Sequence, residues 1–294
     1  MRDVFLNTTT ELLAEDPRIA VVLADISAAN LAGAASRYPG RVVNVGIREQ
    51  LMIGVAGGLA LTGLRPIAHS YATFLIDRAY EQIKLDLSHQ DVGAILVSVG
   101  ASYDGSREGR THQSPGDVAL LDTIGGWRVH TPGHPGEVAG LLRAAAGRDD
   151  RVYLRLTTQV NDHPVEVDAD RPRLVTVRPG GRSLVLAVGP MLGPVLAATE
   201  GLDVTVAYTN TPRPFDGPGL RAFGSDAVIL VEPYLAGTSA AAVTAALADR
   251  PRRVLALGVG DQDVRRYGEP ADHARWHGLD PAGLRRSVVD FLAA

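Results

Sequence analysis

A carboxylate stands at the head of an otherwise apolar segment, NVGIREQLMIGVAGGLALTG, and it is a first candidate for acid–base chemistry in this chain. Glu49 precedes a run of leucine, isoleucine, valine, alanine and glycine, which predicts a largely buried helix over residues 47–62. A helix dipole stabilises such a carboxylate by about 0.3–1 kcal/mol, so its position alone also fits a structural role. A dry setting would in addition strengthen each hydrogen bond that the carboxylate makes.

Two further segments carry ring-bearing side chains. Tyr71 and Phe74 lie in YATFLIDRAYEQ, although aromatic residues make up only 5% of the chain. His112 lies in the polar loop 101–117, which follows an apolar strand, and α/β proteins place ligands in loops at the carboxyl ends of parallel strands. Histidine titrates near neutral pH, so His112 is the best candidate for an acid or base. Taken singly, core packing explains the aromatic residues and solvent exposure explains the histidine.

The composition argues against several classes of function. The chain has 294 residues, 46% of them hydrophobic, and a formal net charge of -4 with both signs mixed, so no nucleic-acid surface is indicated. There is no cysteine, which excludes disulfides and thiolate chemistry, and the eight histidines show no metal-ligand spacing. No apolar run approaches the roughly 20 residues that cross a bilayer, and no signal peptide is recognisable. We therefore expect a soluble, cytoplasmic protein without a membrane partner or a metal site of its own.

Strand-type segments alternate with helical ones along the chain, which predicts an α/β fold with two domains, each with a mostly parallel sheet flanked by helices. In the first half, strands are expected over 18–26, 41–45, 65–70, 92–100, 127–132 and 151–157. In the second half, they are expected over 183–189, 203–209, 226–232 and 253–260. The stretch 159–182 is rich in proline, aspartate and arginine, and it is typical of a linker or a sheet-edge excursion. The predicted domains are therefore residues 1–165 and 166–294.

The order of these segments resembles a known family. IREQ before a glycine-rich helix, then ATFxxxRAYEQI, then an xxEGxTHQ loop, are similar to the pyrimidine-binding domain of transketolases. 1-Deoxyxylulose-5-phosphate synthases share much of this pattern. VLAVG, a strand ending in VEPY and a closing GLDPAGLRRSVVDFL helix resemble the C-terminal domain of the same family. The resemblance covers nearly the whole chain and implies the thiamine-diphosphate-binding fold.

The resemblance implies thiamine diphosphate as cofactor and assigns residues to it. Glu49 would hydrogen-bond the pyrimidine nitrogen N1′ and drive formation of the imino tautomer, which takes the proton from the thiazolium C2. Phe74 matches the aromatic residue that stacks on the pyrimidine ring, with Tyr71 as the fallback. Asp25 matches an aspartate near the thiazolium, and Ile26 matches a bulky aliphatic residue that bends the cofactor.

The resemblance also implies a substrate site. His112 matches a histidine that contacts donor and acceptor hydroxyls, which makes it both catalytic and substrate-binding. Glu108 stands where transketolases usually carry an aspartate that contacts a substrate hydroxyl.

The residues that bind the substrate phosphate in this family are only partly present in this chain. Arg2 matches the first of two phosphate-binding arginines, but threonines 157–158 stand where the second is expected. Arg155 precedes them, and we expect it to point elsewhere, because neighbouring strand residues alternate faces. Either Arg107 or Arg110 replaces the missing arginine, or the substrate carries no phosphate. An unusual donor or acceptor, as in a specialised biosynthetic pathway, is therefore the expectation.

Full-length family members begin with another α/β domain, which binds the diphosphate through Mg²⁺ with a GDG motif followed by an asparagine. This sequence contains no GDG. The resemblance therefore implies one subunit of a split enzyme, whose partner is an N-terminal transketolase-like subunit that carries the diphosphate and Mg²⁺ site. The cofactor would lie at the interface, and the usual assembly would be an α2β2 tetramer.

The leading hypothesis is transfer of a two-carbon ketol unit from a ketose-like donor to an aldehyde acceptor. One alternative is the beta subunit of a 2-oxo acid dehydrogenase first component, although THQ after EG fits a transketolase better. A 1-deoxyxylulose-5-phosphate synthase-like enzyme is another. A non-catalytic scaffolding subunit is the third, and the presence of Asp25, Glu49 and Phe74 argues against it. His69, in IAHSY, either faces the cofactor or lies in the core with its hydrogen bonds satisfied.

Overall fold

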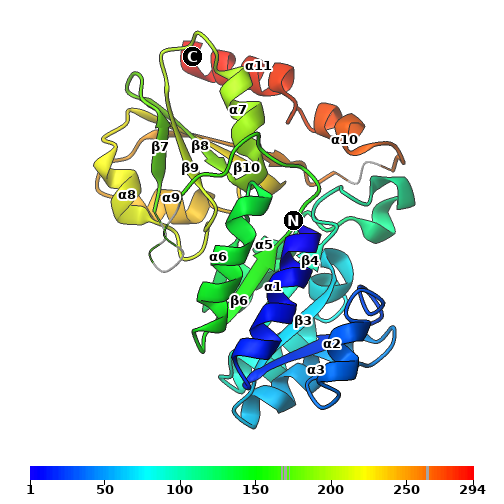
Figure 1. Ribbon diagram of the computed structural model, residues 1–294. Helices are drawn as coiled ribbons and strands as arrows, with labels where there is room; N and C mark the ends of the chain where they lie inside the picture. Colours follow the sequence, from blue (N-terminus) through cyan, green and yellow to red (C-terminus); the bar gives the residue numbers. More distant parts are fainter. Residues whose placement is uncertain (167, 169–170, 172, 263–264) are drawn as a thin grey trace.

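Two sheets organise the computed structural model, which describes residues 1–166, 168, 171, 173–262 and 265–294 (Figure 1). The first sheet has six strands in the order β2-β1-β3-β4-β6-β5, and each pairs in parallel with its neighbours. The second has five strands in the order β11-β10-β8-β9-β7, with β7 joined antiparallel at its edge. The predicted α/β architecture with two mostly parallel sheets is confirmed.

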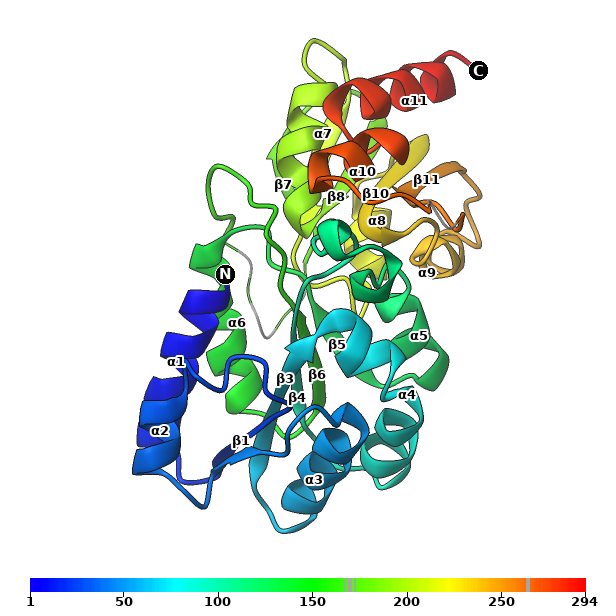
Figure 2. The same ribbon diagram turned by 90° about the vertical axis from the view of Figure 1, so that its right-hand side faces the viewer.

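Helices cover both faces of the first sheet (Figure 2). Its strands are β1 (Ile19–Leu23), β2 (Val42–Asn44), β3 (Arg65–Tyr71), β4 (Ile95–Val99), β5 (Trp127–His130) and β6 (Arg151–Arg155). One face packs against α1 (Arg2–Glu15), α2 (Ala32–Arg37) and α6 (Pro135–Ala146). The other face packs against α3 (Glu49–Leu61), α5 (Asp117–Ile124) and the segment 73–89. Because both faces are covered, β1 and β4 are almost wholly apolar, which explains why they are readable as continuous apolar runs. β3, β5 and β6 also bury polar side chains, among them Arg65, His130 and Arg155.

The second sheet is covered in the same way. Its strands are β7 (Val175–Arg178), β8 (Ser183–Val188), β9 (Thr205–Thr209), β10 (Ala227–Leu235) and β11 (Arg253–Val259). Its helices are α7 (Leu192–Ala198), α8 (Gly217–Ala222), α9 (Ala240–Ala246), α10 (Pro270–Trp276) and α11 (Pro281–Ala293). α7 and α11 pack on one face, and α8 and α9 pack on the other.

The connection between the sheets contains a strand. β7 lies inside the stretch 159–182 and forms the antiparallel edge of the second sheet, so the edge excursion is observed. It is half-buried and lacks a crossover helix, which is why no strong apolar pattern marks it. The predicted division between residues 165 and 166 falls within this connection, after β6 and before β7.

The helix that follows β3 departs from a regular α-helix. A π-helical turn, η1 (Thr73–Asp77), leads into the short α4 (Tyr80–Gln82) and a second π-helical segment, η2 (Ile83–His89). π-helical segments are rare and occur frequently at functional sites. η1 carries Phe74, so the wider turn sets the direction of a predicted site residue.

The glycines of α3 allow a close approach within the chain. A Cβ atom at Gly57 would lie 2.5 Å from the backbone oxygen of Asp86 in η2, whereas one at Gly58 would meet nothing within 4 Å. Gly57 therefore packs against its own chain.

Replacing Gly57 by alanine is expected to lower the free energy of unfolding by about 1–3 kcal/mol, because the new methyl group overpacks the contact between α3 and η2. Gly58→Ala is the matched control one residue along the same helix. There the methyl group meets open space, and the variant is expected to gain up to about 1 kcal/mol, because alanine favours the helix. Urea unfolding followed by circular dichroism measures both, and equal effects would contradict the close-packing interpretation.

Candidate functional site

The Glu49 carboxylate begins α3 and is buried, with 1% of the side chain exposed. Two polar groups hold it. Ser70 Oγ, from β3, donates a hydrogen bond to Oε1 at 3.2 Å, and Arg78 Nη1, from the turn after η1, donates to Oε2 at 2.6 Å. A buried charge needs a partner, and Arg78 supplies one to Glu49.

Three rings lie beside this pair. The Arg78 guanidinium stands over the Phe74 ring, 4.1 Å from its centroid. The centroids of Phe74 and His112 are 5.1 Å apart, and Tyr71 lies 6.0 Å from Phe74 and 5.9 Å from His112, in each case edge to face. The fold therefore brings Glu49 and these three predicted residues together from three separate segments of the chain.

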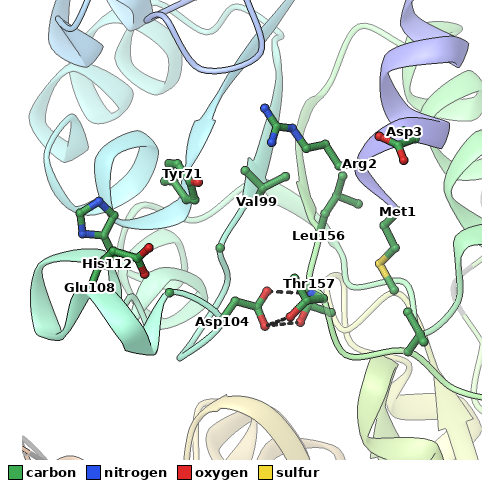
Figure 3. Close-up of a pocket in the computed structure, with 14 residues that line it drawn as sticks. Met1, Arg2, Asp3, Tyr71, Val99, Asp104, Glu108, His112, Leu156 and Thr157 are labelled. Atoms are coloured by element: carbon green, nitrogen blue, oxygen red, sulfur yellow. Dashed lines mark hydrogen bonds between the residues drawn. The ribbon is translucent and has the colours of Figure 1, made fainter. Parts of the chain in front are cut away.

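A cavity of about 460 Å³ opens next to the rings, at the carboxyl ends of β3, β4 and β6 (Figure 3). Of the predicted residues, it is lined by Tyr71, His112, Glu108 and Arg2. Figure 3 shows Arg2 on one side of this space, with Glu108 and His112 together on another side. The site is thus a hollow with acid–base groups at its edge, as expected for α/β proteins.

Arg2 is fixed by a chain of hydrogen bonds from the core. His69 is fully buried, and burial lowers its pKa to about 4, so the ring is neutral at pH 7. Its Nδ1 lies 2.8 Å from the Val97 carbonyl oxygen and its Nε2 lies 2.8 Å from Ser27 Oγ. The carbonyl only accepts, so Nδ1 donates to it and Nε2 accepts from the serine. Ser27 Oγ in turn accepts from Arg2 Nε at 3.1 Å and Nη2 at 2.8 Å. His69 is therefore satisfied in the core and acts on the cavity only through Ser27.

Five predicted residues are not among the described residues that line the cavity: Glu49 and Phe74, which lie beside its rings, and Asp25, Ile26 and Arg110. Asp25 follows β1 with a φ of 65° and accepts a hydrogen bond from Asn44 Nδ2 at 2.9 Å. Ile26 packs partly against the core beneath α1. Arg110 lines a separate small recess that also contains His277. The structure thus does not place Arg110 at the cavity of about 460 Å³, and the expected cofactor roles of Asp25 and Ile26 stay predictions.

A carboxylate that sequence reasoning missed also lines the cavity. Asp104 accepts hydrogen bonds from Thr157 Oγ1 at 3.0 Å, Thr158 Oγ1 at 2.8 Å and the Thr158 N–H at 2.8 Å. Burial raises its pKa, while these three donors favour the ionised form and oppose that rise. Thr157 and Thr158 stand where the second phosphate-binding arginine was expected. They hold the negatively charged Asp104 carboxylate there, in place of the positive charge of an arginine. No sequence signal marks this contact, since its partners lie more than fifty residues apart.

Arg155, the last residue of β6, does not line the cavity, as expected. Its side chain is 1% exposed and donates through Nε to Asp117 Oδ2 at 2.7 Å. Its Nη2 donates to Ser102 Oγ at 2.6 Å, and Ser102 Oγ donates to the Pro233 carbonyl of β10. Tyr153 OH also donates to Asp117, at 2.7 Å. The buried ion pair between Arg155 and Asp117 lies where the two sheets meet. Arg155 therefore contributes no positive charge to the lining of the cavity.

Two kinds of feature are absent from the described residues. No three of their histidine, aspartate or glutamate side chains converge in a way that would hold a metal ion. No helix in that part of the chain has the length and apolar character needed to cross a bilayer.

Comparisons with known proteins give consistent matches. A family model described as the pyrimidine-binding domain of transketolase matches residues 1–162. An uncharacterised 33.6 kDa protein in the fasciation locus of Rhodococcoides fascians is 50% identical over 297 residues, which cover 99% of this chain and 95% of that protein. The 1-deoxy-D-xylulose-5-phosphate synthase of Cupriavidus taiwanensis is 35% identical over 269 residues. That match covers 86% of this chain but 41% of the synthase, so the chain spans less than half the length of that relative.

Among solved structures, a split gene transketolase described as an inactive beta4 tetramer is similar over its length. The TM-score is 0.83 at 26% sequence identity, and the match covers 99% of this chain and 97% of that one.

Proposed function

The chain belongs to the transketolase family of thiamine diphosphate-dependent transferases, and from that premise we propose that it is one subunit of a two-component enzyme that transfers a two-carbon ketol unit from a ketose to an aldehyde. One observation carries the proposal: the buried Glu49 carboxylate, the Phe74 ring and the His112 imidazole converge beside a cavity of about 460 Å³. An acceptor for a ring nitrogen, a flat face for stacking and an acid–base group next to a hollow are what the reaction requires.

The Glu49 and Phe74 side chains fit an aminopyrimidine ring. The Arg78 guanidinium, which is planar and carries N–H donors, already stands on the Phe74 ring and donates to the Glu49 carboxylate. A planar group that carries N–H donors can thus stack on Phe74 and donate a hydrogen bond to Glu49 at the same time. Glu49 would hold the pyrimidine nitrogen, and Phe74, with Tyr71 next to it, would support the ring.

The residues of this chain divide the chemistry among them. Thiamine diphosphate, when bound, supplies a nucleophilic carbon for ketol transfer. Glu49 holds a proton shared with the pyrimidine nitrogen, and the buried setting strengthens that hydrogen bond. His112 moves protons to and from substrate hydroxyls at the edge of the cavity, and Glu108 accepts a hydrogen bond from a hydroxyl there. Arg2, oriented by Ser27, binds the substrate from the other side.

A partner subunit completes the enzyme in this proposal. The chain matches a split gene transketolase nearly end to end, whereas it spans less than half of a single-chain relative. The partner would be an N-terminal transketolase-like chain that binds the diphosphate and Mg²⁺, in an α2β2 assembly with the cofactor at the interface. We expect such a partner because the synthase contains a further part, more than half of its length, that this chain does not match.

Titration calorimetry tests the shared site. Thiamine diphosphate with Mg²⁺ is titrated into this chain alone and into this chain co-purified with a transketolase-like partner that carries a GDG motif. We expect tight, Mg²⁺-dependent binding only in the pair, because the pyrimidine contacts lie here and the diphosphate contacts lie on the partner. Equally tight binding to this chain alone would contradict the split site. Absence of binding by both preparations would favour a scaffolding subunit.

A 1-deoxyxylulose-5-phosphate synthase-like reaction is the second candidate, because such a synthase is 35% identical to this chain. That reaction, like that of a 2-oxo acid dehydrogenase component, consumes a 2-oxo acid and releases CO₂. Ketol transfer instead converts a ketose into a shorter aldose. Product analysis of the assembled pair with pyruvate, and separately with a ketose and an aldehyde, distinguishes these reactions.

A further inference from the structure

The cavity beside His112 is lined by more negative than positive side chains. Asp3, Asp104 and Glu108 contribute carboxylates, while Arg2 contributes the one guanidinium among the described lining residues. A phosphorylated sugar carries about two negative charges at neutral pH and would meet these carboxylates at close range. The electrostatic character of the cavity therefore opposes an anionic substrate.

Asp104 is the most firmly placed of the three carboxylates. Thr157 Oγ1 accepts from the Gln159 N–H at 3.2 Å, so its own hydrogen is committed to Asp104. Oδ1 accepts from both threonine hydroxyls, and Oδ2 accepts from the Thr158 N–H. A carboxylate oxygen has two acceptor positions, so Oδ2 retains room for one more donor. In Figure 3, Asp104 and Thr157 lie together on the side of the cavity across from Arg2.

Apart from the Met1 α-amino group, Arg2 is the one permanently charged cation among the described lining residues, and it lies across the cavity from Asp104. Arg155 is the nearest basic residue along β6, but it is buried, does not line the cavity, and is paired with Asp117. The positive charge of Arg155 is compensated by the Asp117 carboxylate and lies outside the cavity. Arg2 stands across the space, where Asp3 is its neighbour in α1.

We propose that Asp104, held by Thr157 and Thr158, is a specificity-determining residue that rejects a phosphate and accepts a hydrogen-bond donor at the far end of the substrate. This inference rests on the proposed ketol transfer and narrows its substrate class. The substrate is then a sugar whose distal end carries hydroxyl or ammonium groups and no phosphate. The donor reaches Oδ2 of Asp104, while Arg2 holds an oxygen of the same sugar.

Matched substrate pairs test the proposal in the assembled enzyme. D-fructose and its 6-phosphate serve as donors, and D-erythrose and its 4-phosphate serve as acceptors. For the natural enzyme, we expect kcat/KM to favour the free sugar of each pair. Asp104→Asn is expected to shift the ratio at least about tenfold toward the phosphorylated sugar, mainly through KM, because a like charge is removed. An asparagine keeps the size of the side chain and can bond the same threonines, so the fold is retained.

Two further variants sharpen the test. Glu108→Gln removes a second lining carboxylate that is exposed, so a smaller shift in the same direction is expected. Asp203→Asn removes an exposed carboxylate in the second domain and is expected to leave the ratio unchanged. A natural enzyme that prefers the phosphorylated sugars, with a ratio unchanged by Asp104→Asn, would overturn the proposal.

A binding measurement separates this inference from the proposed function. Inorganic phosphate is titrated into the chain and into Asp104→Asn, with binding followed by NMR. We expect at least about tenfold tighter phosphate binding in the variant. If no sugar pair supports transfer, the proposed function is contradicted, yet the titration still decides whether Asp104 repels anions. Equal phosphate affinity in both proteins would overturn the inference alone.

Discussion

Replacement of Glu49 by glutamine is expected to lower the turnover of ketol transfer by about 10²–10⁴-fold in the assembled enzyme, the range typical of a lost proton-transfer group. Glutamine has nearly the same shape and can still bond Ser70 and Arg78, but it cannot hold the proton that the pyrimidine nitrogen shares. Arg78, 38% exposed, can turn toward solvent once its charged partner is gone. The fold should therefore survive, and steady-state kinetics with unchanged thermal unfolding would show a chemical defect.

The exchange of the cofactor C2 proton with deuterium gives an independent reading of this variant. We expect exchange, followed by NMR, to slow together with turnover, because both depend on the same proton. Glu200→Gln, at an exposed position of the second domain, is the control and should leave both rates unchanged. A loss of less than tenfold in Glu49→Gln would contradict the proposed role of Glu49.

Removing Asp117 is expected to have the largest effect on stability. Asp117→Ala leaves the Arg155 guanidinium buried without its ion-pair partner, and it also deprives Tyr153 OH of its acceptor. Breaking one side of a buried pair typically costs about 3–5 kcal/mol in the free energy of unfolding. Urea unfolding monitored by circular dichroism measures the loss.

A double variant separates the lost pair from the lost volume. Asp117→Leu with Arg155→Met replaces both charges by apolar side chains and is expected to recover most of the stability. Asp226→Ala breaks an exposed ion pair with Arg182, and its effect should be far smaller, because solvent already screens that pair. Similar losses from Asp117→Ala and Asp226→Ala would show that burial of the Arg155 pair contributes little.

The sequence predicted the sheets and the meeting of the central site residues for identifiable physical reasons. β1, β4 and β8 are covered on both faces and almost wholly apolar, so they could be read directly. Parallel strands end at one edge of a sheet, and this is why Tyr71 and His112 lie together, although forty residues separate them.

Other features depend on contacts that no local pattern records. The pairing of Arg78 with Glu49 follows from the π-helical turn after β3, which sequence periodicity did not predict. Asp104, which follows β4, is held by Thr157 and Thr158, which follow the neighbouring strand β6 but lie more than fifty residues away in the sequence. β7 was unmarked since a half-buried antiparallel edge strand carries little apolar character.

The hydrogen bonds of Arg155 bear on how the two halves of the chain can move. The backbone passes from one sheet to the other between β6 and β7, but Arg155 reaches Ser102, and Ser102 reaches the Pro233 carbonyl in β10. The Arg155 guanidinium also lies 5.5 Å from the centroid of the Tyr234 ring. A hinge rotation of one half would strip these buried groups of their partners, which is costly in a dry setting. Rotation of one half against the other is therefore expected to be opposed by this buried contact between β6, the loop after β4 and β10.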